Sequence, residues 1–262
     1  KFQLANPDNV YSKNSFKAEY QKKNTGKGSI INMSRKYQLS KQDHLKLANL
    51  CHKNKIDYLC SAFDTESLQF LVKKVKVKYI KVPSGEITSL DMLDYISSLK
   101  KKIILSTGMA SIKEIKDAIK KLSKKRKQNI VILHCVSSYP TNKKDLNLNI
   151  IREFQRIFKL DIGFSDHSLG NEACLAAVAM GAKVIEKHVT ISKKKRGPDH
   201  SSSSSIKDFF SLVKQIRELE IMLGGPKKKL LQSEKNTKDV SRKSLITNKD
   251  LIRGKRLKSS DI

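Results

Sequence analysis

The chain has 262 residues, and 54 Lys and Arg against 25 Asp and Glu give it a formal net charge of +29. A hydrophobic content of 38% is enough for a folded core and excludes an intrinsically disordered chain. No apolar stretch approaches the roughly 20 residues that cross a bilayer, and the first residues carry no signal-peptide pattern. We therefore expect a cytoplasmic protein with no membrane partner.

The positive charge raises nucleic acid as a possible partner. The excess is mostly lysine, however, in scattered positions and in short runs at 193–195 and 227–229, and Trp is absent. Single-stranded nucleic-acid sites usually combine basic grooves with aromatic side chains. Nucleic acid is therefore not the expected partner, although a non-catalytic basic barrel that binds it stays an alternative.

The four cysteines have no Cys-x-x-Cys pair and no regular spacing; they are Cys51, Cys60, Cys135 and Cys174. We expect buried, reduced thiols.

In chain order, Phe2 and Gln3 are read as the end of a strand, and a helix is predicted over about 40–54 with Ser40 as its cap. From Ile56 onward, short runs rich in Val, Ile and Leu alternate with amphipathic segments of helical period. The predicted strands are 56–62, 77–83, 102–106, 129–135, 160–165 and 182–189. Asp64 and the Ser111/Glu114 capping box mark helix starts between them.

Six strand–helix units in unbroken succession favour a parallel barrel over a doubly wound sheet. Since a closed barrel of this kind needs eight strands, the pattern predicts a (β/α)8 TIM barrel that lacks its first strand, which would lie upstream of residue 1. The predicted barrel domain covers 1–225. A lysine-rich linker follows over 226–240, and 241–262 is too short for a domain of its own.

Two histidines each follow one of two consecutive predicted strands, His167 after GFSD (163–166) and His188 after VIEK (184–187). The carboxyl ends of parallel strands meet at one rim, so both imidazoles should emerge together and could bind a divalent metal. The simpler alternative is a pair of hydrogen-bonded or surface histidines.

Other strand ends also carry polar side chains, which should share this rim: Lys1, Gln3, Ser61, Lys81, Ser84, Glu86, Ser106, Thr107, His134, Ser137, Tyr139, Ser165, Asp166, Glu186 and Lys187. Lysines and hydroxyls that converge on one opening suit an anion with many oxygens, such as a molecule with both a phosphate and a carboxylate. Asp199 lies in the following loop, where it could bind substrate hydroxyls or cap the turn.

Eight blocks of the chain together resemble the sialic acid synthase family, which includes N-acetylneuraminate, legionaminate and pseudaminate synthases. They are KFQ (1–3), SAFD (61–64), KVPSGEI (81–87), LSTGM (105–109), LHCVSSYPT (133–141), GFSDH (163–167), EKH (186–188) and GPDH (197–200). The PSGE block is more similar to the N-acetylneuraminate and legionaminate members than to the pseudaminate ones.

The resemblance implies a TIM barrel joined to a small antifreeze-like domain, of which 241–262 would be the start. It implies a transferase that forms a C–C bond between phosphoenolpyruvate and an N-acylated amino sugar, such as N-acetylmannosamine or a 2,4-diacetamido-trideoxy-hexose, and releases phosphate. It also implies a homodimer.

By the same resemblance, His167 and His188 match ligands of Mn²⁺ or Mg²⁺ and are catalytic, with Glu86 as a further catalytic candidate. The phosphoenolpyruvate contacts match Lys1, Ser61, Lys81, Ser84, Ser106 and Ser165, and the sugar contacts match Gln3, Tyr139 and Asp199.

Two departures from the pattern of the sialic acid synthase family bear on activity. The family's first strand, with a glutamate, would precede residue 1, and the arginine that reaches the partner's sugar site would follow residue 262. Val136 also stands where the family usually has Thr. A pseudaminate synthase and a metal-dependent barrel hydrolase stay as alternatives.

Overall fold

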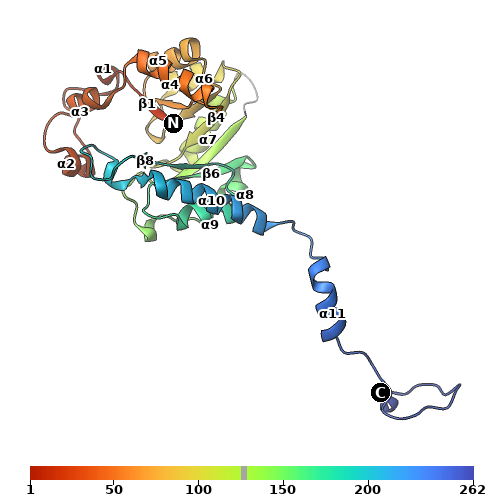
Figure 1. Cartoon of the computed structure of the whole chain (residues 1–262). Helices are drawn as coiled ribbons and strands as arrows, with labels where there is room; N and C mark the ends of the chain where they lie inside the picture. The colour runs from red at the N-terminus through yellow and green to blue at the C-terminus, as the bar shows by residue number, and fades with distance from the viewer. Residues whose placement is uncertain (125–128) are drawn as a thin grey trace. The chain divides into compact units, whose positions relative to one another are not determined.

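A parallel β-sheet of seven strands organises residues 1–223 in the computed structural model, which describes residues 1–124 and 129–262 (Figure 1). The strands are β1 (Phe2–Leu4), β2 (Cys60–Ala62), β3 (Tyr79–Val82), β4 (Lys102–Ser106), β5 (Ile130–Cys135), β6 (Asp161–Asp166) and β7 (Ile185–Lys187). Each strand pairs in parallel with the next strand in the chain. This order is that of a TIM-like half-barrel and confirms the α/β prediction.

Helices connect the strands. The α-helices are α1 (Pro7–Val10), α2 (Glu19–Thr25), α3 (Ile30–Tyr37), α4 (Lys41–Lys53), α5 (Thr65–Phe70), α6 (Leu90–Ser97), α7 (Ile112–Leu122), α8 (Ile150–Phe158), α9 (Glu172–Ala179) and α10 (Ile206–Leu223). A short π-helix, η1 (Leu71–Val75), continues α5, and three-residue 3₁₀ turns lie at η2 (Ser84–Glu86), η3 (Lys143–Asp145) and η4 (His200–Ser202). A separate two-stranded sheet pairs β8 (Val189–Thr190) with β9 (Ser204–Ser205).

The predicted helix caps are confirmed. Ser40 accepts from the backbone of Asp43, whose carboxylate reaches back in a capping box, and Ser111 and Glu114 form the same arrangement before α7. Asp64 caps α5 through its bond from the Ser67 amide. These side chains satisfy amides that the first helical turn leaves without a partner, so they fix where each helix begins.

The core lies between the sheet and its helices. Leu93 and Ile96 of α6 pack with Ile103 and Leu105 of β4, and Phe164 of β6 belongs to the same fully buried cluster. The continuous apolar runs of the sequence therefore correspond to strands with both faces covered, as expected for a parallel sheet.

Three local predictions differ from the structure. The run 56–62 forms a strand only at β2, because Lys55 has a positive φ and Ile56 is 61% exposed. The run 182–189 divides at His188, whose carbonyl accepts from the Ser204 amide as the chain turns into β8. The helices α1, α2 and α3 lie in a segment where no helix was predicted.

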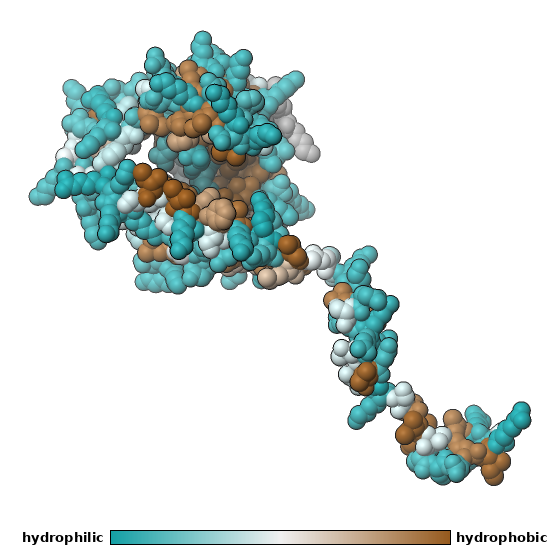
Figure 2. All heavy atoms as spheres, viewed as in Figure 1, coloured by the Kyte–Doolittle hydropathy of each residue, from teal (hydrophilic) through white to brown (hydrophobic). Residues whose placement is uncertain are grey.

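The two end strands of the sheet, β1 and β7, each have one edge without a strand partner among the described residues. A cavity of about 470 Å³ lies beside them, with Leu59, Ile104, Val184 and Phe209 among its lining residues. Hydrophobic atoms are also visible around a hollow in the face that Figure 2 draws. An additional strand that closes the barrel stays a prediction.

Residues Gly224–Ile262 form the second compact unit, with η5 (Gln232–Glu234), α11 (Lys235–Ser241) and η6 (Ser259–Asp261). Within it, the buried Asp261 carboxylate binds Lys249 and Lys255 at 2.8 and 2.9 Å. The linker over 226–240 and the antifreeze-like character of 241–262 stay predictions.

All four cysteines are free, and Cys60, Cys135 and Cys174 are buried. Across residues 1–124 and 129–262, no helix has both the length and the apolar character that a membrane crossing requires.

Replacing Asp64 should destabilise the first unit. Its buried carboxylate accepts from the Ser67 amide at 2.8 Å, the Ser67 hydroxyl at 2.6 Å and the Asn6 amide at 2.7 Å, so it joins the chain after β1 to the start of α5. We expect Asp64→Ala to lower the free energy of unfolding by about 1–3 kcal/mol, because three donors lose their acceptor. Urea denaturation measures this, with Asp57→Ala as the control.

Asp57 makes one exposed ion pair with Lys78, so its removal should change stability by less than about 0.5 kcal/mol. Equal losses in the two variants would contradict the structural role of Asp64.

Candidate functional site

The carboxyl ends of the strands enclose a cavity of about 310 Å³, called here the mouth cavity. Most of the residues that the sequence singled out line it: Lys1, Gln3, Ser61, Lys81, Ser84, Ser106, Tyr139, Ser165, His167 and His188. Side chains from all seven strands and their following loops therefore meet at one opening. This is where α/β barrels hold their ligands.

Strand register explains why these side chains share the cavity. Gln3, Ser61 and Lys81 are Cα partners across β1, β2 and β3, and Cys135, Ser165 and Glu186 are partners across β5, β6 and β7. Side chains alternate between the two faces of a strand, so partners in register point to the same side. Two rows of polar residues thereby face the inside of the barrel.

A buried carboxylate links the two lysines of the mouth cavity. Glu186 lies 2.8 Å from Lys1 Nζ and 3.8 Å from Lys81 Nζ, and it accepts a hydrogen bond of 2.9 Å from Ser165 Oγ. Lys81 also donates to Ser106 Oγ at 2.7 Å. The lysine ammonium groups are thus held in place by groups from other strands.

Burial and charge set the protonation of this cluster. Burial by itself would raise the pKa of Glu186, but Lys81 and Lys1 together lower that pKa to about 2. Burial lowers the pKa of Lys81 to about 8, although Glu186 partly offsets the effect. Glu186 is therefore a carboxylate at neutral pH.

The two predicted metal-ligating histidines do come together, with ring centroids 5.2 Å apart. His167 Nδ1 lies 2.8 Å from the Val136 carbonyl, which can only accept, so Nδ1 carries a proton and the neutral ring has its lone pair on Nε2. Burial lowers the pKa of His167, but its contacts with Cys135 and the Val136 carbonyl outweigh burial and raise that pKa. Burial, then the neighbouring His167 and Lys1, lower the pKa of His188 to about 3. A neutral imidazole is the form that binds metal.

Aromatic rings border the histidines. The Tyr139 ring centroid is 4.2 Å from that of His167, and Tyr20 of α2 stacks on Tyr139 with centroids 4.9 Å apart. Tyr139 and Tyr20 therefore form one wall of the mouth cavity. Nothing in the sequence pattern singled out Tyr20 as a cavity residue, because it lies in α2, where no helix was predicted.

Asp199 lies beside the mouth cavity and lines the neighbouring 470 Å³ cavity together with Lys1 and His188. Its Oδ2 is 3.6 Å from His188 Nδ1, while its buried Oδ1 has no hydrogen-bond partner among the described residues. Burial raises the pKa of Asp199. Its free oxygen is available to a ligand.

Glu86 is not among the residues that line the mouth cavity. It ends the η2 turn and is half-buried, and burial raises its pKa. Its predicted catalytic role therefore has no contact with the cavity to support it.

Three further rim residues point away from the mouth cavity. His134 hydrogen bonds with the Leu146 carbonyl at 2.8 Å and stacks on Phe164, so placing it at the rim was wrong. Asp166 pairs with Lys187 on the opposite face of the sheet. His134, Asp166 and Lys187 each alternate along their strand with a residue that faces the cavity, as the two-residue period of a strand requires.

Two cavity residues were given no role from sequence. Glu186 was recognised only as part of the rim, and Cys135 only as a buried thiol. Cys135 Sγ lies 3.9 Å from His167 Nδ1 and accepts from Ser84 Oγ at 3.7 Å. Register with Ser165 was the signal that could have placed both of them in the cavity.

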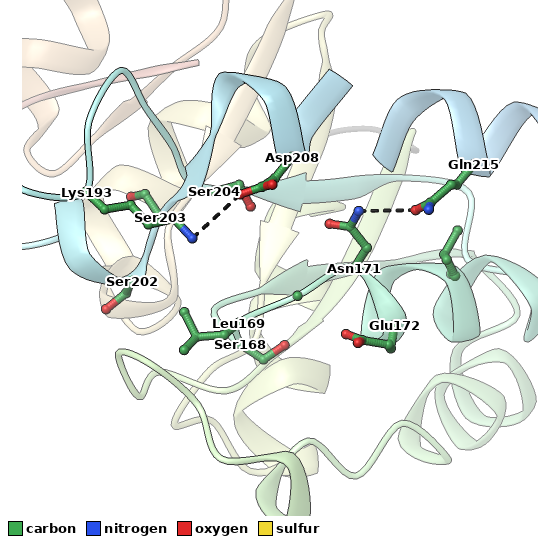
Figure 3. A pocket seen from close by; sticks show the side chains of 12 residues that line it. Ser168, Leu169, Asn171, Glu172, Lys193, Ser202, Ser203, Ser204, Asp208 and Gln215 are labelled. Carbon is green, nitrogen blue, oxygen red and sulfur yellow. Dashed lines mark hydrogen bonds and ion pairs between the residues drawn. The ribbon is translucent and has the colours of Figure 1, made fainter. Parts of the chain in front are cut away.

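A second polar cavity, of about 380 Å³, lies at the start of α9 (Figure 3). Asn171 donates to Gln215 of α10 across it, and Lys193 pairs with Asp208 at 3.6 Å. No residue with a predicted role lines this cavity.

Within the described residues, no cluster of three or more His, Cys, Asp or Glu side chains forms a complete metal site. The two imidazoles could contribute only part of a coordination shell, which water or a bound substrate would complete.

A family model described as the NeuB family matches residues 1–228, so the chain belongs to that family. The chain is 41% identical to the N,N'-diacetyllegionaminic acid synthase of Campylobacter jejuni, covering 97% of this chain and 77% of that protein. It is 30% identical to the pseudaminic acid synthase of Helicobacter pylori, covering 84% of this chain and 64% of that protein.

Among solved structures, the N-acetylneuraminic acid synthetase of Leptospira borgpetersenii in complex with citrate is similar, with a TM-score of 0.80 and 32% identity. The similarity covers 91% of this chain and 78% of that one.

Gly108 should be needed for the wall of the mouth cavity. A Cβ there would lie 2.2 Å from Ser137 Oγ and 2.9 Å from Ser84 Oγ, whose hydroxyl accepts from the Gly108 amide. We expect Gly108→Ala to displace both serines and to lower the free energy of unfolding by roughly 1–3 kcal/mol. Thermal unfolding and a crystal structure of the variant would measure both effects.

The matched control is Gly85→Ala, since Gly85 lines the same cavity and a Cβ there meets nothing within 4 Å. If the two variants have the same free energy of unfolding, the close approach at Gly108 does not affect stability.

Proposed function

We propose that this member of the NeuB family condenses phosphoenolpyruvate with an N-acylated amino sugar to give a sialic-type nonulosonic acid and phosphate. The observation that carries the proposal is the mouth cavity, where two lysines and several serine hydroxyls converge beside two imidazoles whose ring centroids are 5.2 Å apart. The first group suits a phosphate and a carboxylate, and the second suits a metal ion.

The anionic end of the substrate would bind at the lysines. Lys1 and Lys81 would offset the charges of the phosphate and carboxylate, and hydroxyls of Ser61, Ser84, Ser106 and Ser165 would donate to their oxygens. These contacts act on charge that the substrate already has, so their main contribution is to hold its C3 carbon in position.

The sugar would bind between Gln3, Tyr139 and Asp199. The Asp199 Oδ1 atom, which is buried without a partner among the described residues, can accept from a sugar hydroxyl. Burial raises the pKa of Tyr139 far above its usual range, so its phenol stays protonated and can donate. Glu86 does not line the cavity and has no substrate contact in this proposal.

The donors present fit a divalent ion. His167 offers Nε2 because Nδ1 is held by the Val136 carbonyl, and His188 stays neutral. Bound by these two side chains, Mn²⁺ or Mg²⁺ would supply Lewis-acid polarisation of the sugar carbonyl. The chain's own residues then align the two substrates, so that C3 of phosphoenolpyruvate attacks the aldehyde carbon, water adds at C2 and phosphate leaves.

The sugar is proposed to be of the N-acetylmannosamine or 2,4-diacetamido-trideoxy-hexose type. The higher identity to a legionaminic acid synthase than to a pseudaminic acid synthase supports this choice, with pseudaminate synthesis as the alternative. Assembly as a homodimer stays a prediction.

The assay is incubation of the chain with phosphoenolpyruvate, each candidate sugar and Mn²⁺, with phosphate release and product mass measured together. We expect phosphate and a nonulosonic acid in equal amounts, and no phosphate without sugar. Phosphate release that needs no sugar would indicate a hydrolase instead, and tight binding of nucleic acid without turnover would favour the basic-barrel alternative.

Removing the imidazoles should abolish metal binding. We expect His167→Ala/His188→Ala to lose the Mn²⁺ affinity seen by calorimetry and at least about a hundredfold in turnover, because both proposed metal ligands are removed. The fold should stay intact, because both side chains lie at the rim and not in the core. The control is His52→Ala, an exposed histidine of α4. Unchanged Mn²⁺ affinity in the double variant would contradict the metal assignment.

A further inference from the structure

We propose that Glu186 is the resident counter-anion of the mouth cavity: its carboxylate offsets part of the positive charge of the cavity's two lysines before substrate arrives and limits how tightly an anionic substrate is then held. The proposal rests on the function proposed above and assigns a positioning and affinity-setting role to a residue that had none.

The contacts of Glu186 coincide with the proposed contacts of the anionic substrate. Its carboxylate binds Lys1 at 2.8 Å and Ser165 at 2.9 Å, and its Oε1 lies 3.8 Å from Lys81 Nζ. Half of the six residues proposed to bind phosphoenolpyruvate therefore already bind a carboxylate of the chain itself. An arriving anion must share these three donors with Glu186.

Because Lys81 and Glu186 are buried, their charges have a large effect on the affinity for an anion. The side chains of Lys81 and Glu186 are 2% and 14% exposed, so water screens their charges poorly. In the part of the chain that the structure describes, Glu186 is the one carboxylate within 4.0 Å of Lys81. A buried ammonium without a counter-charge is costly, which explains why the cavity holds a carboxylate at all.

Two lysines and one glutamate leave the cluster with a net charge of +1. Phosphoenolpyruvate brings several negative charges to it, and the charge of Glu186 opposes them. Replacing Glu186 by Gln keeps the side-chain length and one oxygen that can accept from Ser165, but raises the net charge to +2. At the effective dielectric of a protein site, one more unit of charge about 6 Å away should strengthen anion binding by about ten- to a hundredfold.

A purely structural role gives the opposite sign. If Glu186 only held Lys1 and Lys81 in position, Glu186→Gln would release both and weaken every anion. The direction of the change in affinity therefore separates the two roles.

The next residue pair along β6 and β7 offers a matched control. Asp166 of β6 is also a buried carboxylate paired with a lysine of β7, Lys187, but this pair lies on the opposite face. Asp166→Asn removes the same charge without touching the donors of the mouth cavity.

The experiment is calorimetric titration of the native chain, Glu186→Gln, Glu186→Asp and Asp166→Asn with phosphoenolpyruvate and, separately, with inorganic phosphate. Circular dichroism confirms that each variant is folded. We expect about ten- to a hundredfold tighter binding of both anions to Glu186→Gln, a return toward native affinity in Glu186→Asp, and native affinity in Asp166→Asn. Steady-state kinetics should show a lower KM for phosphoenolpyruvate, with a lower kcat because phosphate also leaves more slowly.

Weaker or unchanged anion affinity in Glu186→Gln overturns the inference, and so does equal tightening in Asp166→Asn. If phosphoenolpyruvate binds no variant but phosphate binds Glu186→Gln more tightly, the proposed function is wrong and the counter-anion role stands. If neither anion binds any of the proteins, both proposals fail.

Discussion

The ion pair between Lys1 and Glu186 connects the two end strands of the sheet. Lys1 directly precedes β1 and Glu186 lies in β7, so their 2.8 Å contact spans the interior from one unpaired edge to the other. Sheet hydrogen bonds hold each strand to its neighbour, but between these two strands the charge pair is the contact that faces the mouth cavity. Glu186 is therefore held from both sides, by Lys1 and by the Ser165 hydroxyl of the neighbouring strand β6.

The period of a β-strand then sorts the polar residues of β6 and β7 into two functions. Ser165 and Glu186 face the cavity, while the next residue on each strand, Asp166 and Lys187, faces outward as a buried pair. The outward pair also binds Ser168 and Cys174, at the turn that leads into α9. One face of these strands therefore lines the mouth cavity, and the other binds side chains at the start of the helix that follows.

The sequence was sufficient for features that depend on local pattern. Apolar runs located four of the seven strands closely, and Ser40, Asp64 and Ser111 marked helix starts, because a cap acts within its own turn. The sequence was insufficient where tertiary contacts determine which side chains face the cavity. His134 and His167 both lie at strand ends, yet only register with neighbouring strands determines which one faces the cavity. Glu186 was missed as a functional residue for the same reason, since its partners are 21 or more positions away in sequence.

The lysines and the imidazole pair of the mouth cavity are also coupled electrostatically. Burial is the largest cause of the low pKa of His188, and the positive charge of Lys1 adds to it. The lysine cation therefore also disfavours protonation of the neighbouring imidazole, and an imidazole without a second proton keeps the lone pair that metal binding needs. Glu186 acts in the opposite sense on His188, so the carboxylate moderates both effects. The mouth cavity thus combines both signs of charge: the proposed anion site depends on the lysines, and without the carboxylate the buried ammonium groups would lack a counter-charge.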